Sequence, residues 1–329
     1  MTIEPGVVVK GEAGTGANAT ALLIARGAKI NAAGEADKPI IFTSIADEIT
    51  PNDVLAGNAV SPNLEPTVNG LWGGLIVLGN ATISASNDNG DISEVQIEGI
   101  PTSDPNGLYG GSDDTDNSGV LQYISIRHGG ANIGSGNEIN GLTLGGVGSG
   151  TVIENIEVVG NQDDGIEWFG GTVNVTNALV WNAGDDGLDT DQAWAGTMDN
   201  FIVVTVAGHS FELDGPEGTF AAGHTIQNGS VIASDAERQS ADLINVDDNS
   251  IVDLRNIYIT GIEAGQQINR VNAAGVTFEN ITLNVDAANL GSHIDGAVPA
   301  GVTTGTTPQA DKSAFDWTWA AKSGGLTEL

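Results

Sequence analysis

The sequence predicts an all-β protein, a single-stranded parallel β-helix (β-solenoid) of about a dozen coils that forms one domain over residues 1–329. Short segments rich in Val, Ile and Thr are separated by Gly, Asn and Asp, a pattern typical of short strands joined by turns. An asparagine followed by alternating apolar residues also recurs at intervals of 22, 23, 28, 28 and 24 residues. A unit that returns at a nearly fixed interval indicates a solenoid, because each coil must return to the same place before the next is added.

The recurring asparagine marks one bend of each coil. We expect its side chain to point inward and to stack on the next coil, because stacked amides can hydrogen-bond to one another and satisfy buried polar groups at a bend between sheets. The six asparagines are Asn155, Asn177, Asn200, Asn228, Asn256 and Asn280.

Strand-like segments before the first of these asparagines fit the same scheme. They cover residues 6–11, 21–34, 38–44, 71–84, 95–99 and 119–130. Two polar segments rich in Pro and Gly, at about residues 45–71 and 84–118, are too long for ordinary turns. We therefore predict two loop insertions, and insertions on a rigid scaffold are where binding surfaces tend to lie.

The segment at about residues 300–329 is polar until Phe315, Trp317 and Trp319 alternate near its end. A solenoid needs its open end covered, since the last coil would otherwise expose core side chains and an unpaired strand edge. We therefore predict that this segment is a C-terminal cap over the open end.

Charge excludes several classes of partner. The chain has 43 acidic and 10 basic residues, which give a formal net charge of −33. Such a surface repels nucleic acid and anionic membranes, and no run of 18 or more apolar residues predicts membrane insertion. No lysine lies between Lys38 and Lys312, so an anionic substrate would meet few cations there.

The N-terminus lacks the pattern of an export signal, and we interpret Met1 as a trimmed start.

One acidic motif occurs twice in register. Asp163-Asp164-Gly165-Ile166-Glu167 returns 22 residues later as Asp185-Asp186-Gly187-Leu188-Asp189. Asp-Asp-Gly is favourable turn chemistry, so the repeat is consistent with a structural corner. Stacked carboxylates could also bind a cation, or support glycoside hydrolysis if their neighbours raise the pKa of some of them. The sequence leaves these three interpretations open.

Two acidic loops are candidate cation sites. In residues 112–119, Asp114, Asp116 and Ser118 alternate before a glycine as in the first half of a calcium loop, although Ser125 stands where such a loop has a bidentate glutamate. Residues 87–91 are the second candidate. Oxygen ligands on a flexible acidic loop favour calcium. The candidate ligands are Asp113, Asp114, Asp116, Asp88 and Asp91.

The chain resembles secreted bacterial right-handed parallel β-helix proteins of the pectate-lyase-like superfamily. The resemblance rests on "TIEPGVVVKG", "ADKPIIFTS", "LWGGLIVLG", "DDGIEWFGGTV" and "FDWTWAAK", and it covers nearly the whole chain. It implies a right-handed β-helix that is exported from the cell.

A narrower resemblance is to polygalacturonases, which have the same fold. The phrases "QDDGIEW", "GDDGLDT" and "AGHSFEL" occur in the order of that family's catalytic turns. The resemblance implies catalytic roles for Asp164, Asp185, Asp186 and His209. The family's basic element that holds the substrate carboxylate has no counterpart, and Arg270 is the nearest residue to it.

The sequence favours an extracellular or cell-surface β-solenoid with a structural, adhesive or filament-forming role that binds divalent cations. We expect the protein to associate with other copies of itself through the ends or edges of the solenoid. We also expect it to bind glycans. A glycoside hydrolase and a non-catalytic glycan-binding module are the alternatives. In the hydrolase, Asp186 would be the general acid, Asp164 or Asp185 would activate water, His209 would orient the site, and the glycan would be neutral or weakly charged.

Overall fold

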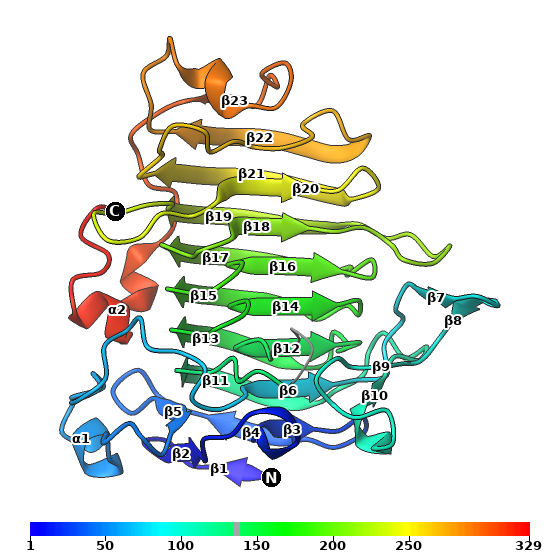
Figure 1. The fold of residues 1–329 in the computed structure, drawn as a ribbon, viewed down its shortest axis with the longest axis vertical. Helices are drawn as coiled ribbons and strands as arrows, with labels where there is room; N and C mark the ends of the chain where they lie inside the picture. The colour runs from blue at the N-terminus through cyan, green and yellow to red at the C-terminus, as the bar shows by residue number, and fades with distance from the viewer. Residues whose placement is uncertain (134–138) are drawn as a thin grey trace.

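The computed structural model describes residues 1–133 and 139–329 as a right-handed parallel β-helix, which confirms the predicted fold class (Figure 1). Sheet A passes through β1 (Thr2–Ile3), β4 (Ile30–Ala33), β11 (Gly119–Arg127), β13 (Val152–Val159), β15 (Val175–Trp181), β17 (Thr197–Val204), β19 (His224–Ile232), β21 (Ile251–Thr260), β22 (Gly275–Leu283) and β23 (Val302–Thr304), with β2 (Val8–Gly11) and β5 (Ile40–Ser44) beside its first rungs. Sheet B passes through β3 (Leu22–Ile24), β6 (Leu75–Leu78), β12 (Leu142–Gly145), β14 (Ile166–Phe169), β16 (Leu188–Asp191), β18 (His209–Leu213) and β20 (Asp242–Val246).

Each long strand of sheet A bends at one residue with positive φ, and the repeating asparagines occupy this position with φ between 50° and 59°. Asparagine is among the few residues that adopt this conformation readily. The amides stack: Asn177 Nδ2 donates to Asn155 Oδ1 (2.9 Å), and Asn200 Nδ2 donates to Asn177 Oδ1 (2.6 Å). The ladder continues from Asn256 to Asn228 and from Asn280 to Asn256.

The predicted direction of this ladder is wrong. Ile153 and Ile156, on either side of the first asparagine, both lie in the core, so the amide between them faces outward. Asn200 accordingly accepts a hydrogen bond from the backbone N–H of Asp311, in the C-terminal segment that lies on the outside. The ladder is also interrupted once, because Asn228 donates to Asp199 instead of to Asn200.

One apolar core fills the inside of the coils and is formed by the inward side chains of both sheets. Its packing explains the glycine in the repeat "QNGSVI". A Cβ atom at Gly229 would lie 1.9 Å from Cζ of Phe201, the residue that pairs with it on the preceding rung. A large aromatic ring on one rung is therefore matched by a glycine on the next.

Two long segments leave the coils. Residues 45–71 contain the short helix α1 (Pro51–Leu55), which Thr50 and Asp53 cap through reciprocal hydrogen bonds. Residues 84–118 form two antiparallel pairs that project from the lower part of the rod, as Figure 1 shows. The pairs are β7 (Ala85–Asn87) with β8 (Gly90–Ile92), and β9 (Val95–Gln96) with β10 (Leu108–Tyr109). The 3-10 helices outside the C-terminal segment are η1 (Gly16–Asn18), η2 (Pro105–Gly107) and η3 (Leu290–His293).

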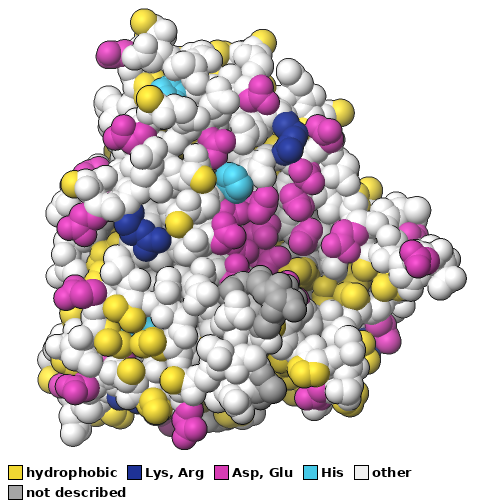
Figure 2. All heavy atoms as spheres, in the orientation of Figure 1, with side chains coloured by type: hydrophobic (Ala, Val, Ile, Leu, Met, Phe, Trp, Pro, Cys, Tyr) yellow, Lys and Arg dark blue, Asp and Glu magenta, His cyan; other side chains and the backbone are white. Residues whose placement is uncertain are grey.

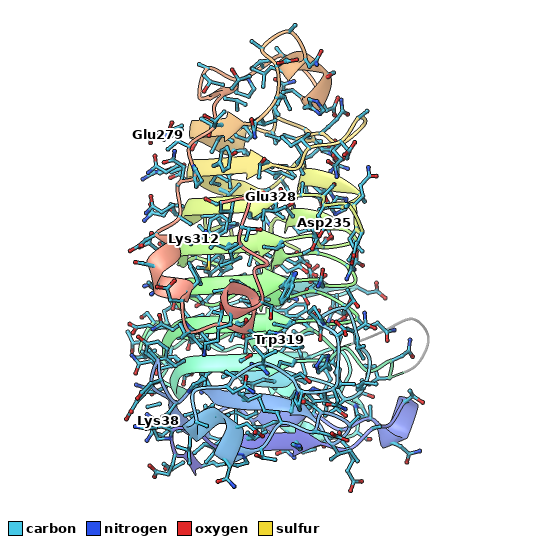
Figure 3. All side chains as sticks on the ribbon, turned by 90° about the vertical axis from the view of Figure 1, so that its left-hand side faces the viewer. Lys38, Asp235, Glu279, Lys312, Trp319 and Glu328 are labelled. Carbon is cyan, nitrogen blue, oxygen red and sulfur yellow. The ribbon has the colours of Figure 1, made fainter. Side chains whose placement is uncertain are left out.

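The C-terminal segment contains η4 (Lys312–Phe315) and α2 (Trp319–Lys322) and lies along the side of the rod (Figure 3). The prediction that its aromatic residues cover the open end is wrong. Outward apolar side chains of sheet A, among them Leu179, Trp181 and Ile202, form a second core with Phe315 and Trp319. The segment lies there because sheet A is apolar on its outer face at these rungs, and burial of that surface is favourable.

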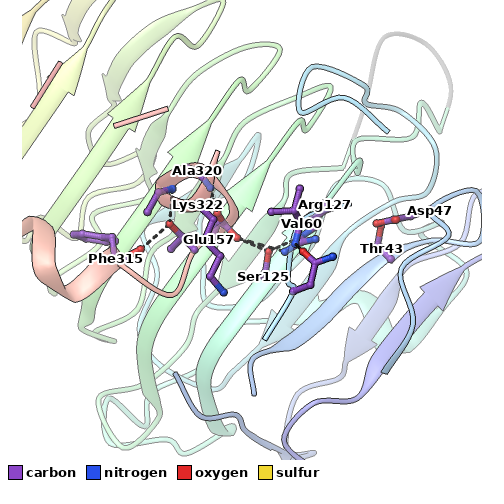
Figure 4. Close-up of polar contacts among 12 residues, drawn as sticks. Thr43, Asp47, Val60, Ser125, Arg127, Glu157, Phe315, Ala320 and Lys322 are labelled. Atoms are coloured by element: carbon purple, nitrogen blue, oxygen red, sulfur yellow. Dashed lines mark hydrogen bonds and ion pairs between the residues drawn. The ribbon is translucent and has the colours of Figure 1, made fainter. Parts of the chain in front are cut away.

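A buried ion pair fixes the C-terminal segment to sheet A (Figure 4). Arg127 and Glu157 are 1% and 0% exposed, and their Nη2 and Oε2 atoms lie 3.8 Å apart. Ser125 Oγ donates to Glu157 Oε2 (2.6 Å), and the backbone N–H of Ala320 donates to Glu157 Oε1 (3.0 Å). The Arg127 guanidinium also lies 4.9 Å from the centre of the Trp319 ring. The buried negative charge of Glu157 is thereby compensated by Arg127 and by two hydrogen-bond donors.

Candidate functional site

The outer face of sheet B carries acidic side chains on three consecutive rungs. Glu167, Asp189 and Glu212 are direct partners across β14, β16 and β18. The residues before them point into the core, and successive side chains of a strand face opposite sides, so these three carboxylates face outward. Figure 2 shows the acidic side chains gathered at the centre of this face, beside a histidine.

The repeated Asp-Asp-Gly turn lies at the edge of this face and has a structural role. Asp164 Oδ1 accepts the backbone N–H of Asp186 from the next coil (2.8 Å). Asp186 in turn accepts the backbone N–H of His209, and Asp242 accepts that of Gln267. Each of these carboxylates satisfies a backbone donor one coil further on, which supports the interpretation of the repeat as a structural corner.

Asp186, His209 and Glu212 form the first cluster, in which one ligand atom of each lies within 4.8 Å of those of the other two. Asp186 is 1% exposed, and His209 Nδ1 lies 3.2 Å from its Oδ2. Burial would raise the pKa of Asp186, but hydrogen bonds with His209 and Glu212 outweigh it and lower the pKa. The hydrogen bond with Asp186 raises the pKa of His209.

The sequence-based reason for choosing Asp186 as general acid, a pKa raised by neighbouring carboxylates, is contradicted by its lowered pKa. A carboxyl group with a lowered pKa that is only 1% exposed is also poorly placed to deliver a proton to a substrate. Its neighbour Glu212 has the properties required: burial, followed by the hydrogen bond with Asp186, raises its pKa to about 8. Two carboxyl groups in contact share a proton because both cannot be charged at once.

Asp164, Glu167 and Asp189 form a second cluster, again with one oxygen of each within 4.8 Å of the others. They are 8%, 5% and 8% exposed. Burial, followed by the charges of neighbouring carboxylates, raises the pKa of each well above its ordinary value. The prediction that clustering raises the pKa of some of these groups is confirmed. Asp163 and Asp185 complete a third group around Asp164, and Asp185 is exposed.

The acidic face continues one position further along the strands. Burial, followed by the charge of Asp214, raises the pKa of Asp191 to about 7. Burial, followed by the charge of Asp247, raises the pKa of Asp214 to about 6. Arg270 Nη1 lies 3.3 Å from Asp247 and marks the edge of the acidic surface.

The carboxylates of the first predicted calcium loop are used in hydrogen bonds. Asp113 closes its own turn, Asp114 Oδ1 accepts the backbone N–H of Thr82 (2.9 Å), and Asp116 Oδ1 accepts from Asn80 Nδ2 (3.0 Å). These contacts fix the loop against the turn after β6. In the part of the chain that the structure describes, the groups of three clustered metal ligands lie on sheet B and not in this loop.

The second predicted loop lies at the turn between β7 and β8. Asp91 accepts hydrogen bonds from the backbone N–H and the hydroxyl of Thr219, which fixes the hairpin to the loop after β18. Asp88 is exposed at the tip. The residues that could hold a metal are therefore those of the repeated turn and the strands after it.

Sequence reasoning missed Glu212, Asp191 and Asp214. Glu212 follows a histidine turn that lacks the Asp-Asp pair of the two preceding coils. The sequence contains a signal that could have located Glu212: an apolar residue followed by an acidic one recurs at the same position of three coils. These pairs are Ile166-Glu167, Leu188-Asp189 and Phe211-Glu212, spaced by 22 and 23 residues.

A comparison with protein families found a match over almost the entire chain. The family described as "Pectate-lyase like beta helix domain" matches residues 1–322. No curated protein and no solved structure matches the chain. Among the described residues, no helix has both the length and the apolar character needed to cross a membrane.

Proposed function

Because the chain belongs to the pectate-lyase-like β-helix family, we propose that it is an extracellular, polysaccharide-active glycoside hydrolase whose substrate lies along the outer face of sheet B. The observation that carries the proposal is a pair of outward carboxyl groups, Glu212 and Asp214, whose pKa values lie on either side of neutral pH. Such a pair is typical of acid-base catalysis by two carboxyl groups in one site.

The geometry supports one role for each group. Glu212 and Asp214 are two residues apart in an extended segment, so their side chains leave the same face of the chain from Cα atoms about 7 Å apart. Inverting glycosidases separate their carboxyl groups by roughly 6.5 to 9.5 Å, which leaves room for a water molecule. Glu212 would protonate the leaving oxygen, and Asp214 would activate the water. The buried Asp186, through its hydrogen bond with Glu212, would hold Glu212 in its protonated form, and His209 would orient Asp186.

The substrate is proposed to be a neutral or weakly charged glycan. The acidic face repels uronates, and Arg270 is the nearest match to a basic element that could hold a carboxylate. A panel of neutral plant and marine polysaccharides should reveal new reducing ends, with a rate that is highest between about pH 6 and pH 8, where Asp214 is ionised and Glu212 is protonated.

Variants test the assignment. Glu212→Gln and Asp214→Asn should each lower kcat by about 100-fold or more, because each removes one proton-transfer group. Glu237→Gln, which changes an exposed glutamate on another loop, should leave the rate unchanged. Activity retained in both site variants, or no reducing ends from any glycan, would refute the hydrolase.

A structural or adhesive solenoid is the second candidate, and charge distribution favours it. Four of the ten basic residues and four of the 43 acidic residues lie in residues 1–38, so this end is neutral while the remainder is strongly acidic. Self-association through the ends or edges of the rod would extend a filament. Sedimentation at increasing protein concentration tests this, and a monomer at all concentrations would exclude it.

Calcium is the cation that we propose for this protein, and the candidate sites on sheet B replace the two acidic loops as its location. Oxygen ligands favour a hard cation, as they did in the sequence prediction.

A further inference from the structure

The second cluster, Asp164, Glu167 and Asp189, buries three carboxylates that the fold does not neutralise. The groups that act most strongly on their charges are other carboxylates, together with the backbone N–H of Asp186. Three buried anions in contact are unfavourable unless protons or a cation neutralise them. The side chains come from two adjacent coils, so whatever neutralises them also joins the coils.

Two buried oxygen atoms at this cluster lack a hydrogen-bond donor. Within the described part of the chain, Oδ1 of Asp189 is buried and has no partner. Oδ1 of Asn140 is likewise buried without a partner, while its Nδ2 donates to Glu167. Buried acceptors are almost always satisfied in folded proteins, and an unsatisfied one costs about 1 to 3 kcal/mol. Both atoms are acceptors, so a cation would satisfy them and an anion would not.

We propose that Asp164, Glu167 and Asp189 bind one calcium ion, which satisfies the unpartnered oxygen of Asp189 and joins the coils of β14 and β16. Carboxylate and amide oxygens are the ligands of hard cations. The three oxygens lie within 4.8 Å of one another, so one cation could contact all three. Calcium accepts an irregular set of oxygen ligands, whereas magnesium requires a nearly octahedral one, so this cluster favours calcium.

The remaining ligands have an evident source. Asn140 lies beside Glu167 and has a free amide oxygen, and calcium accepts amide oxygens and water in addition to carboxylates. The slight exposure of Asp164 and Asp189 leaves a path for the ion from solvent. This site is structural and does not depend on the proposed hydrolase, which uses the next carboxylates along the face.

Titration of calcium into chelator-treated protein tests the site. Calorimetry and thermal unfolding at constant ionic strength should show one bound calcium per chain and a melting temperature that rises with calcium concentration. Asp189→Asn should weaken calcium binding by about tenfold or more and abolish most of the rise.

Controls distinguish this site from a general response to salt. Asp88→Asn removes an exposed charge from the hairpin tip and should bind calcium as the wild type does. Glu167→Gln is a second variant of the site if Asp189→Asn does not fold, and it should weaken binding similarly. Equal calcium affinity in the wild type and both site variants would overturn the proposal. Magnesium binding as tight as calcium binding would overturn the choice of calcium.

Discussion

The two outer faces of this β-helix bury acidic side chains in opposite ways. On sheet A, Glu157 lies under the C-terminal segment and contacts Arg127, a serine hydroxyl and a backbone N–H. On sheet B, Glu167 and Asp189 are nearly as buried, but their strongest electrostatic neighbours are other carboxylates.

The difference distinguishes buried charges that stabilise the fold from buried charges that are typical of functional sites. A buried charge that the fold itself compensates holds two parts of the chain together, as the ion pair holds the C-terminal segment. A buried charge that the fold leaves uncompensated requires a proton or an ion from solvent, so its state depends on the surroundings. Groups whose pKa values are displaced in this way are typical of functional sites, and here they lie on sheet B.

The largest effect is expected at the compensated charge. Arg127→Met should lower the free energy of unfolding by about 3 to 5 kcal/mol, because it leaves Glu157 buried without its partner. Denaturant-induced unfolding measures this change. The exposed pair of Arg255 and Asp253 provides the control, and Arg255→Met should change stability by about 1 kcal/mol or less. Equal effects of the two substitutions would mean that the burial of the first pair is unimportant.

A smaller effect is expected at the bend beside the C-terminal segment. Asn200→Leu should cost about 1 to 3 kcal/mol, because it removes the amide contacts with Asn177 and with the backbone of Asp311. Leucine is also unfavourable at a φ of 58°. Asn280→Leu, at the exposed end of the ladder, has fewer contacts to lose and should cost less. A greater cost at Asn280 would contradict this account.

The sequence predicted what depends on a repeated local conformation. The interval between asparagines located the bend because each asparagine occupies the same positive-φ position, and the two Asp-Asp-Gly turns aligned because the coils align. The direction of the asparagines was not predictable from spacing, since it depends on which neighbours reach the core. The position of Phe315 and Trp319 was wrong for a similar reason: the surface that they cover is made by Leu179 and Ile202, more than 100 residues earlier.

On sheet B, stability should depend on pH in the direction opposite to ordinary acid denaturation. Asp191, Asp214 and Glu212 have raised pKa values of about 7, 6 and 8, so the folded state binds more protons than the unfolded state between about pH 4 and pH 8. Stability is therefore lost as pH rises through these values. In calcium-free buffer the melting temperature should increase from pH 8 to pH 5. A melting temperature that falls over this range would contradict the uncompensated charge on sheet B.

The smallest effect isolates one group of that face. Asp191→Asn should stabilise the calcium-free protein by about 1 kcal/mol at pH 8, where the native carboxylate is ionised beside Asp214. At pH 5 Asp191 is already protonated, and the neutral amide has the same charge, so the gain should disappear. Both proteins are compared at both pH values to distinguish an effect of charge from an effect of packing. A gain in stability that is equal at pH 5 and pH 8 would come from packing. A loss at pH 8 would mean that Asp191 has a cationic partner, and sheet B would then resemble sheet A.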